Sequence, residues 1–126
     1  MKLSIVIPIY EELDNIDPLH AQLTKILEEF GRDYEIIFSN DGSKDGSAEA
    51  LDRAADGDPR TKVIHLRRNF GQTAALMAGF NHARGDIVVA MDGDLQNDPK
   101  DIPRLVDELE KGFDVVSGWR IGRKEG

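Results

Sequence analysis

Two aspartates separated by one glycine follow an apolar run in the last third of the chain. The run extends from Ile87 to Met91, and Asp92, Gly93 and Asp94 come directly after it. A β-branched run of this kind is typical of a buried strand. Because side chains alternate along an extended backbone, Asp92 and Asp94 would project to the same side, and Gly93 would let a ligand approach the backbone closely. Paired carboxylates without nitrogen or sulfur ligands favour Mg²⁺ or Mn²⁺ over zinc.

The same three residues are also compatible with an ordinary turn. Aspartate and glycine are common turn residues, and an Asp-Gly-Asp sequence after a strand is frequent in turns that bind nothing. The motif alone therefore does not separate a metal site from a solvated turn, and the rest of the chain has to decide.

Composition limits the classes of protein to consider. A chain of 126 residues is long enough for one domain with a real core. Its formal net charge of −8 argues against nucleic-acid binding, which needs an excess of lysine and arginine. The absence of cysteine excludes disulfides, thiolate metal sites and a cysteine nucleophile, and it is compatible with the reducing cytoplasm. No apolar segment approaches the roughly 20 residues of a membrane span, so we expect a soluble chain.

Short apolar runs alternate with segments of helical periodicity along the whole chain. The runs predict strands over residues 3–9, 33–40, 61–66, 87–91 and 113–117. The intervening segments predict four helices: from an N-cap at Asp17 to Gly31, through 48–55 to a stop at Gly57, over 72–83, and from an N-cap at Asp98 to Gly112. Residues 120–126 are expected to form a polar chain end. Strict alternation of this kind predicts an α/β fold with a parallel sheet and helices on both faces.

In such a sheet the ligand crevice lies beyond the carboxyl ends of the strands. Polar residues follow every expected strand there: Tyr10–Glu12, Asn40–Gly42, Arg67–Asn69, Asp92–Asp94 and Trp119–Arg120. A cleft with paired carboxylates, arginines and glycine-bearing loops could hold a diphosphate and stabilise it as a leaving group. Neither a Walker motif nor GxGxxG is present, so a P-loop NTPase and a dinucleotide-binding Rossmann domain both fit poorly.

Each of these residues also has an alternative, structural explanation. Glu11 and Glu12 also fit solvated charges before a helix, Asp41 fits a turn residue that bonds its own loop, and Tyr10 fits a half-buried core position. Arg67 and Arg68 also fit an exposed strand end. For the three histidines, His20, His65 and His82, a structural role is favoured.

Taken together, the spaced motifs resemble the large inverting glycosyltransferase family with the GT-A fold. Within it, the chain is similar to polyprenyl-phosphate glycosyltransferases such as dolichol-phosphate mannose synthase. The motifs are SIVIPIYEELDNI, IIFSNDGSKDGS, HLRRNFGQTAALMAGFNHARGDIVVAMDGDLQNDP and DVVSGWRIGRKE, in the family's order. The resemblance implies a mostly parallel, Rossmann-like nucleotide-sugar-binding domain over residues 1–126 that is truncated at its C-terminal side.

The resemblance also assigns roles to individual residues. It implies that Pro8, Tyr10 and Glu12 line the nucleoside pocket and that Asp41 hydrogen-bonds the base. It further implies a catalytic metal and diphosphate site, with other residues beside the phosphates or the sugar. These residues are Asp92 and Asp94 with Gln96 as metal ligands, Gly93 between them, Arg120, and Arg68 with Gly71.

The implied reaction is metal-assisted, inverting transfer of a sugar from a UDP- or GDP-linked donor to a polyprenyl phosphate. The resemblance implies a cytoplasmic location, or the cytoplasmic face of a membrane for a full-length protein that reaches the membrane through its C-terminal part. Homo-oligomers remain open, and the 126 residues alone are not expected to suffice for activity. Asn40 replaces an aspartate found in many relatives, which leaves the choice of base open. Asn97-Asp98-Pro99 replaces a commoner Asp-Pro-Pro, a departure expected to alter only the start of the helix.

Two other classes remain as alternatives. One is a haloacid-dehalogenase-like phosphatase with Asp92 as its nucleophile, although Leu95-Gln96 fits that pattern poorly. The other is a receiver-like or nucleotide-sensing α/β module that binds without turnover.

Overall fold

The predicted alternation of strands and helices is present in the structure. The structure is a computed structural model that describes residues 2–91, 97–112 and 120–123. The strands are β1 (Leu3–Ile9), β2 (Tyr34–Asn40), β3 (Thr61–His65), β4 (Ile87–Ala90) and β5 (Arg120–Arg123). The helices are α1 (Leu13–Phe30), α2 (Ser47–Asp56), α3 (Gln72–His82) and α4 (Ile102–Glu110), with the 3₁₀ helix η1 (Pro99–Asp101) leading into α4. Across the described ranges, no helix has the length and apolar content needed to cross a membrane.

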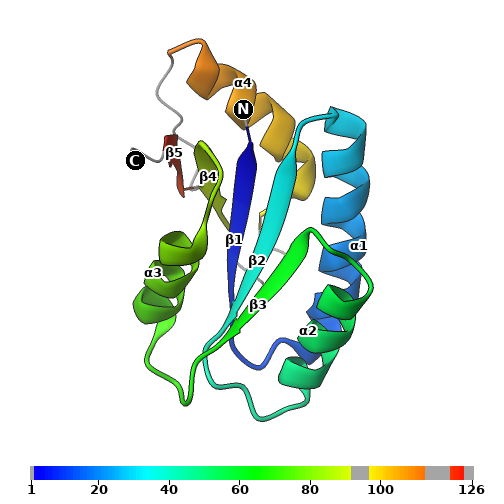
Figure 1. Cartoon of the computed structure of the whole chain (residues 1–126), viewed down its shortest axis with the longest axis vertical. Helices are drawn as coiled ribbons and strands as arrows, with labels where there is room; N and C mark the ends of the chain where they lie inside the picture. Colours follow the sequence, from blue (N-terminus) through cyan, green and yellow to red (C-terminus); the bar gives the residue numbers. More distant parts are fainter. Residues whose placement is uncertain (1, 92–96, 113–119, 124–126) are drawn as a thin grey trace.

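The strands form one sheet in the order β3-β2-β1-β4-β5 (Figure 1). β1 is parallel to both β2 and β4, and β2 is parallel to β3. The chain therefore moves outward from β1 to β3, and α3 then returns it to the other side of β1. The carboxyl ends of β1 and β4 flank the point where this order reverses, which is where open α/β sheets bind ligands.

The edge strand β5 differs from the sequence prediction. Alternation predicted a parallel sheet, but β5 is antiparallel to β4, with Ala90 opposite Arg120. Residues 120–123 were expected in a polar chain end. This short strand carries one large apolar side chain, Ile121, which packs against the core, so hydrophobic periodicity has too few residues to reveal it. The strand predicted over 113–117 lies outside the described residues.

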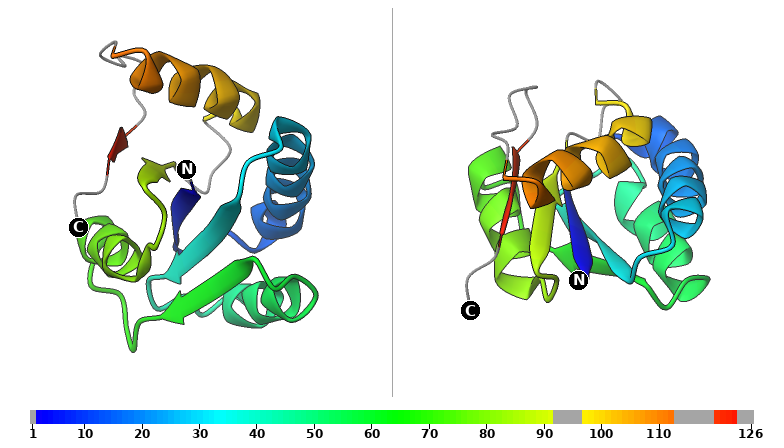
Figure 2. Two further views of the ribbon diagram at one scale, coloured as in Figure 1. Left: turned by 45° about the horizontal axis from the view of Figure 1, so that its top comes forward. Right: turned by 90° about the horizontal axis from the view of Figure 1, so that it is seen from above.

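Helices cover both faces of the sheet (Figure 2). Ile5 and Ile7 of β1 point into the larger core, which is closed by apolar residues of α1, α2 and α4. Val6 points to the opposite face and packs in the smaller core with Leu76 of α3. This inside-outside alternation places both faces of β1 in apolar cores and makes it the rigid centre of the sheet.

The first helix begins earlier than its capping signal indicated. Asp17 and Pro18 predicted the start, but α1 begins at Leu13 and contains Pro18. The Leu13 N–H, which has no partner within the helix, donates to Asp45 Oδ2 at 3.3 Å, so a distant loop satisfies this end of the helix. The prediction for Asp98 is confirmed, because its side chain accepts from the Lys100 N–H at 3.0 Å.

A buried carboxylate lies near the amino edge of the sheet. Glu35 in β2 is 1% exposed and accepts hydrogen bonds from Lys62 Nζ at 2.7 Å, Ser4 Oγ at 2.5 Å and the Arg84 N–H at 2.6 Å. Burial alone would raise the pKa of Glu35, but these hydrogen bonds and the Lys62 charge outweigh it and hold that pKa at about 2. The network joins three strands to the loop that precedes β4.

Candidate nucleotide-sugar site at the carboxyl edge

The described loops at the carboxyl ends of the strands come together as predicted. They are Tyr10–Glu12 after β1, Asp41–Gly46 after β2, Leu66–Gly71 after β3 and Met91 after β4. The Met91 N–H donates to the Val6 carbonyl at 3.0 Å, so β4 stays beside β1 up to the residue before Asp92. Parallel pairing thus places the described loops at one edge.

Large apolar side chains are exposed mainly at this edge. Tyr10 is 46% exposed, Leu13 39% and Phe70 48%, and the fourth such side chain among the described residues, Met77, lies on α3. The alternative that Tyr10 belongs to the core is therefore wrong. Aromatic faces left open beside polar loops are typical of ligand sites.

Asp41 joins the loop after β2 to the loop after β3. Its side chain is 3% exposed. Oδ1 accepts from the Phe70 N–H at 2.8 Å, and Oδ2 accepts from the Gly71 N–H at 3.1 Å and from Asn69 Nδ2 at 3.2 Å. The Asp41 side chain therefore bonds across to the next loop, while its backbone N–H donates to the Ile9 carbonyl at 2.8 Å. The turn-type bond expected as its alternative role is made by Asp45, which accepts from the Ser47 N–H at 3.0 Å.

Gly42 allows this contact between the two loops. Its φ is +74°, and a Cβ added there would lie 2.3 Å from the Arg68 carbonyl carbon and 2.4 Å from the Asn69 nitrogen. Both the backbone conformation and the lack of space require glycine. Gly71, with φ +105°, is the N-cap of α3 and receives the end of the same loop.

The loop after β2 also holds the loop after β1. Ser43 Oγ accepts from the Glu11 N–H at 2.9 Å, and Asp45 Oδ2 accepts from the Leu13 N–H at the start of α1. Glu11 has a positive φ of +52°, and the Glu12 carboxylate accepts from Asn15 Nδ2 at 2.7 Å. Residues 41–46 are therefore the hub that fixes both neighbouring loops, and we call them the hub loop.

The edge carries several negative charges. The Glu11 charge is the main cause that raises the pKa of Tyr10, with smaller contributions from burial, Asp41 and Asp45. Burial would raise the pKa of Asp45, but hydrogen bonds from Ser47 and Leu13 lower it, so its carboxylate is ionised at neutral pH. A diphosphate bound here would be repelled unless cations lay close to it.

Arg68 is one cation available at this edge. Its guanidinium lies 4.7 Å from the centroid of the Phe70 ring, and it forms no ion pair with any residue that the structure describes. The pair therefore presents an aromatic face and a positive charge together, next to Asp41.

The predicted metal site falls outside what the structure describes. Asp92, Gly93, Asp94 and Gln96 are not among the described residues, and Arg120 is described through its strand pairing with Ala90. Within the described ranges, no group of three His, Asp or Glu side chains could hold a metal ion. The metal ligands therefore stay a prediction, placed in the chain directly after Met91.

Sequence reasoning missed the residues that connect the loops. Ser43, Asp45 and Asn69 carried no individual prediction, although the NDGSKDG segment was identified as a loop. Their partners are 28 to 32 residues away in the chain. Local composition can mark a turn, but it does not indicate which distant amide the turn will bind.

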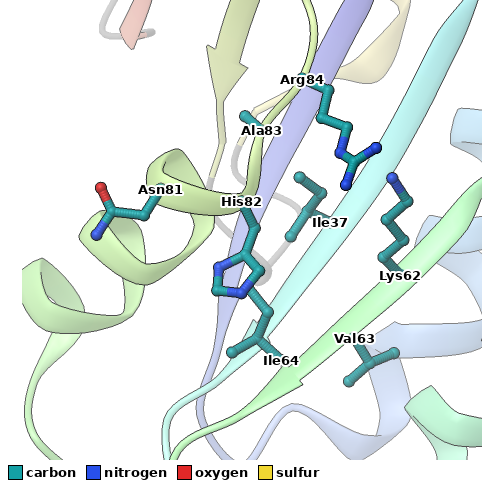
Figure 3. A pocket seen from close by; sticks show the side chains of 8 residues that line it. All are labelled: Ile37, Lys62, Val63, Ile64, Asn81, His82, Ala83 and Arg84. Atoms are coloured by element: carbon teal, nitrogen blue, oxygen red, sulfur yellow. The ribbon is translucent and has the colours of Figure 1, made fainter.

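A separate hollow of about 490 Å³ lies between β3 and the end of α3 (Figure 3). Its lining includes Lys62, Ile64, His82 and Arg84. None of the predicted site residues lines it, so its size does not make it the better candidate for the predicted chemistry.

Comparison with known proteins identifies close sequence relatives. The model of the family described as Glycosyl transferase family 2 matches residues 4–126. An undecaprenyl-phosphate 4-deoxy-4-formamido-L-arabinose transferase from Pseudomonas fluorescens is 48% identical over 125 residues, which cover 98% of this chain and 36% of that protein. The protein of the same name from Edwardsiella ictaluri is 45% identical, with 98% and 38% covered. The chain thus spans little more than a third of the length of these curated relatives.

Solved structures share the fold. The mannosyltransferase PcManGT from Pyrobaculum calidifontis, in complex with GDP-Man and Mn²⁺, matches with a TM-score of 0.67 and 25% identity, covering 85% of this chain and 32% of that one. Glucosyl-3-phosphoglycerate synthase from Mycobacterium tuberculosis matches with a TM-score of 0.69 over 86% of this chain and 39% of that one. At 23% identity the second likeness shows the fold alone. The matches do not favour the phosphatase or the receiver-like module.

Proposed function

Because this chain belongs to glycosyltransferase family 2, we propose that it is the donor-binding part of an inverting glycosyltransferase that transfers a sugar to a polyprenyl phosphate. The observation that carries the proposal is the hub loop, which gathers the loops after β1 and β3 beside the strand that leads into Asp92. The names of the relatives support a polyprenyl-phosphate acceptor.

The nucleoside of the donor would bind between the loops after β1 and β3. Tyr10 and Phe70 expose aromatic faces there, with Pro8 near the end of β1 and Glu12 in the same loop as Tyr10. An ionised carboxylate offers about four acceptor positions, and the described donors to Asp41 use three of them. One position therefore remains for an N–H of the base.

The diphosphate would lie toward β4. Asp92, Asp94 and Gln96 would hold Mg²⁺ or Mn²⁺, whose charge would offset the negative charge that develops on the departing nucleoside diphosphate. An all-oxygen donor set suits such hard ions. Arg68 and Arg120 would add positive charge at an edge rich in carboxylates, with Gly71 beside the sugar and Gly93 leaving room at the backbone.

The acceptor phosphate would attack the anomeric carbon from the side opposite the leaving group, which inverts the configuration. A phosphate monoester has a second pKa near 6, so it is largely a dianion at neutral pH and needs no protein base to activate it. Because the acceptor is a lipid, we place the reaction at the cytoplasmic face of a membrane.

Calorimetric titration of UDP-sugars and GDP-sugars, with and without Mn²⁺, tests this proposal. We expect metal-dependent binding that is lost in Asp94→Asn and kept in Asp56→Asn, which removes the same charge at the far end of α2. Binding that ignores both Mn²⁺ and the Asp94 substitution would overturn the proposed function.

A further inference from the structure

A chain of hydrogen bonds links the surface of α2 to the hub loop through His65. Asp52 Oδ1 lies 2.7 Å from His65 Nε2, and His65 Nδ1 lies 3.0 Å from Asn40 Nδ2. Asn40 Oδ1 in turn accepts from the Ser43 N–H at 3.1 Å. Asn40 is 3% exposed, whereas the side chains of His65 and Asp52 are 38% and 59% exposed. We call these four residues the relay.

The two ends of the relay fix the direction of every bond in it. The Ser43 N–H can only donate, so Asn40 must turn Oδ1 toward it and Nδ2 toward His65. An amide nitrogen only donates, so Nδ1 of His65 must accept and its proton must be on Nε2, which donates to the acceptor-only carboxylate of Asp52. His65 therefore has one tautomer that satisfies both of its neighbours.

The relay ends on the residue that holds the loop after β1. Ser43 Oγ accepts from the Glu11 N–H at 2.9 Å, next to Tyr10. We propose that His65, with its proton on Nε2, is a positioning residue that orients the Asn40 amide. Through Asn40 and Ser43 it holds the hub loop and the loop after β1 in the conformation that binds the donor. This role rests on the proposed function in one respect, because it assumes that the hub loop takes part in binding the donor.

The role depends on an acceptor at the Nδ1 position. The elements packed against His65 present Asp52 from α2 and the neutral Asn40 from β2. A proton on Nδ1 would face the Asn40 amide protons, and turning the amide over would instead set Nδ2 against the Ser43 N–H. Either arrangement loses a bond in the relay.

Two substitutions of His65 separate a positioning role from a merely structural one. His65→Phe removes the acceptor, whereas an asparagine amide oxygen comes close to the Nδ1 position, so His65→Asn retains an acceptor toward Asn40. His82→Phe is the matched control, because His82 is an exposed histidine outside the relay whose Nδ1 lies 2.9 Å from the Ala78 carbonyl. Because the pair of His65 with Asp52 is exposed, its loss should cost little stability. The buried Asn40 amide loses its acceptor in His65→Phe, so we expect the thermal midpoint to fall in that variant, to recover in His65→Asn and to stay unchanged in His82→Phe.

The test combines NMR of the imidazole nitrogens, amide hydrogen exchange and nucleotide-sugar titration on the chain. We expect the neutral imidazole of His65 in the native chain to carry its proton on Nε2. His65→Phe should speed exchange of the Ser43 amide and weaken binding of the UDP-sugar or GDP-sugar about fivefold, the cost of one ordinary hydrogen bond. His65→Asn should restore most of both, and His82→Phe should change neither.

A proton on Nδ1, or a Ser43 amide whose exchange ignores His65→Phe, would overturn the relay itself. If His65→Phe binds the sugar nucleotide as tightly as the native chain does, the positioning role is overturned. If the native chain binds no sugar nucleotide while the tautomer and the exchange results hold, the proposed function fails and so does the positioning of a donor, but the relay stands as the element that orders the loop.

Discussion

The two edges of the sheet each bury a carboxylate carried by the same stretch of chain, but they hold it in different ways. Glu35, near the start of β2, is bonded by a lysine, a hydroxyl and one backbone amide. Asp41, directly after the end of β2, is bonded by two backbone amides and one side-chain amide. Among the described residues, Asp41 has no ion-pair partner, whereas Glu35 pairs with Lys62.

The difference separates a fixed scaffold from an adjustable site. At the amino edge a cation neutralises the buried charge, and the bonds join three strands, so the arrangement can change only at a high cost. At the carboxyl edge the donors belong to loops, and a ligand with N–H groups can share or replace them. We therefore expect substitutions at Glu35 to lower stability and substitutions at Asp41 to lower binding.

Glu35→Ala should have the largest effect on stability. It leaves Ser4, Lys62 and the Arg84 N–H without their shared acceptor. We expect a loss of about 3 kcal/mol in the free energy of unfolding, at the low end for a broken buried pair because Lys62 is 43% exposed and can regain water. Urea denaturation measures it, with Glu29→Ala on the exposed face of α1 as control. Equal stability of the two variants would contradict the scaffold role of the amino edge.

Acid should weaken the same network. Folded Glu35 has a pKa of about 2, well below its ordinary value of 4.5, so the unfolded chain takes up the proton at higher pH than the folded chain does. Its contribution is therefore complete above pH 4.5 and is lost as the pH falls from there toward 2. Denaturation at a series of pH values should show a drop across this range that is smaller in Glu35→Gln. A drop of the same size in both proteins would show that other carboxylates cause it.

Asp41→Asn should affect binding more than stability. The new amide would set its N–H₂ against the Phe70 or Gly71 N–H, and the loop after β3 would lose a bond. We expect nucleotide-sugar binding to weaken at least about tenfold, and unfolding to be easier by about 1–2 kcal/mol. Titration and denaturation of the same sample measure both. A variant that binds normally but is as unstable as Glu35→Ala would remove the distinction between the edges.

Arg104→Ala should have the smallest effect. Its ion pair with Glu108 at 3.1 Å joins side chains that are 55% and 38% exposed on α4. We expect a change within about 0.5 kcal/mol in the free energy of unfolding and none in binding. A larger loss would mean that surface charge, and not the buried network, dominates stability in this chain.

Local sequence signals predicted most of the fold. The β-branched runs predicted β1 to β4, and Gly31 and Asp98 marked one end each of two helices as expected. The exceptions depend on distant partners or on too few residues. The start of α1 is set by Asp45, more than 30 positions further along the chain, and β5 has one large apolar side chain to reveal it.

The candidate site was predictable as a place rather than as a set of contacts. Parallel strand order alone predicts that Tyr10, Asp41 and Arg68 come to one edge. That Asp41 would bond the loop after β3, and that His65 would bond Asn40, could not be read locally, because their partners are 25 to 30 residues away. Both contacts depend on the register between β2 and β3, which places Asn40 opposite His65.

The central claim, that a divalent ion and a sugar nucleotide bind at the carboxyl edge, is tested most directly by paramagnetic NMR broadening with Mn²⁺ and the UDP-sugar or GDP-sugar that binds. We predict that the amide signals of Met91 and Ser43 broaden, that those of Glu35 and Gly85 at the opposite edge stay sharp, and that Asp94→Asn abolishes the difference. Broadening centred on Glu35 and Gly85, or broadening at Met91 that persists in Asp94→Asn, would contradict the account.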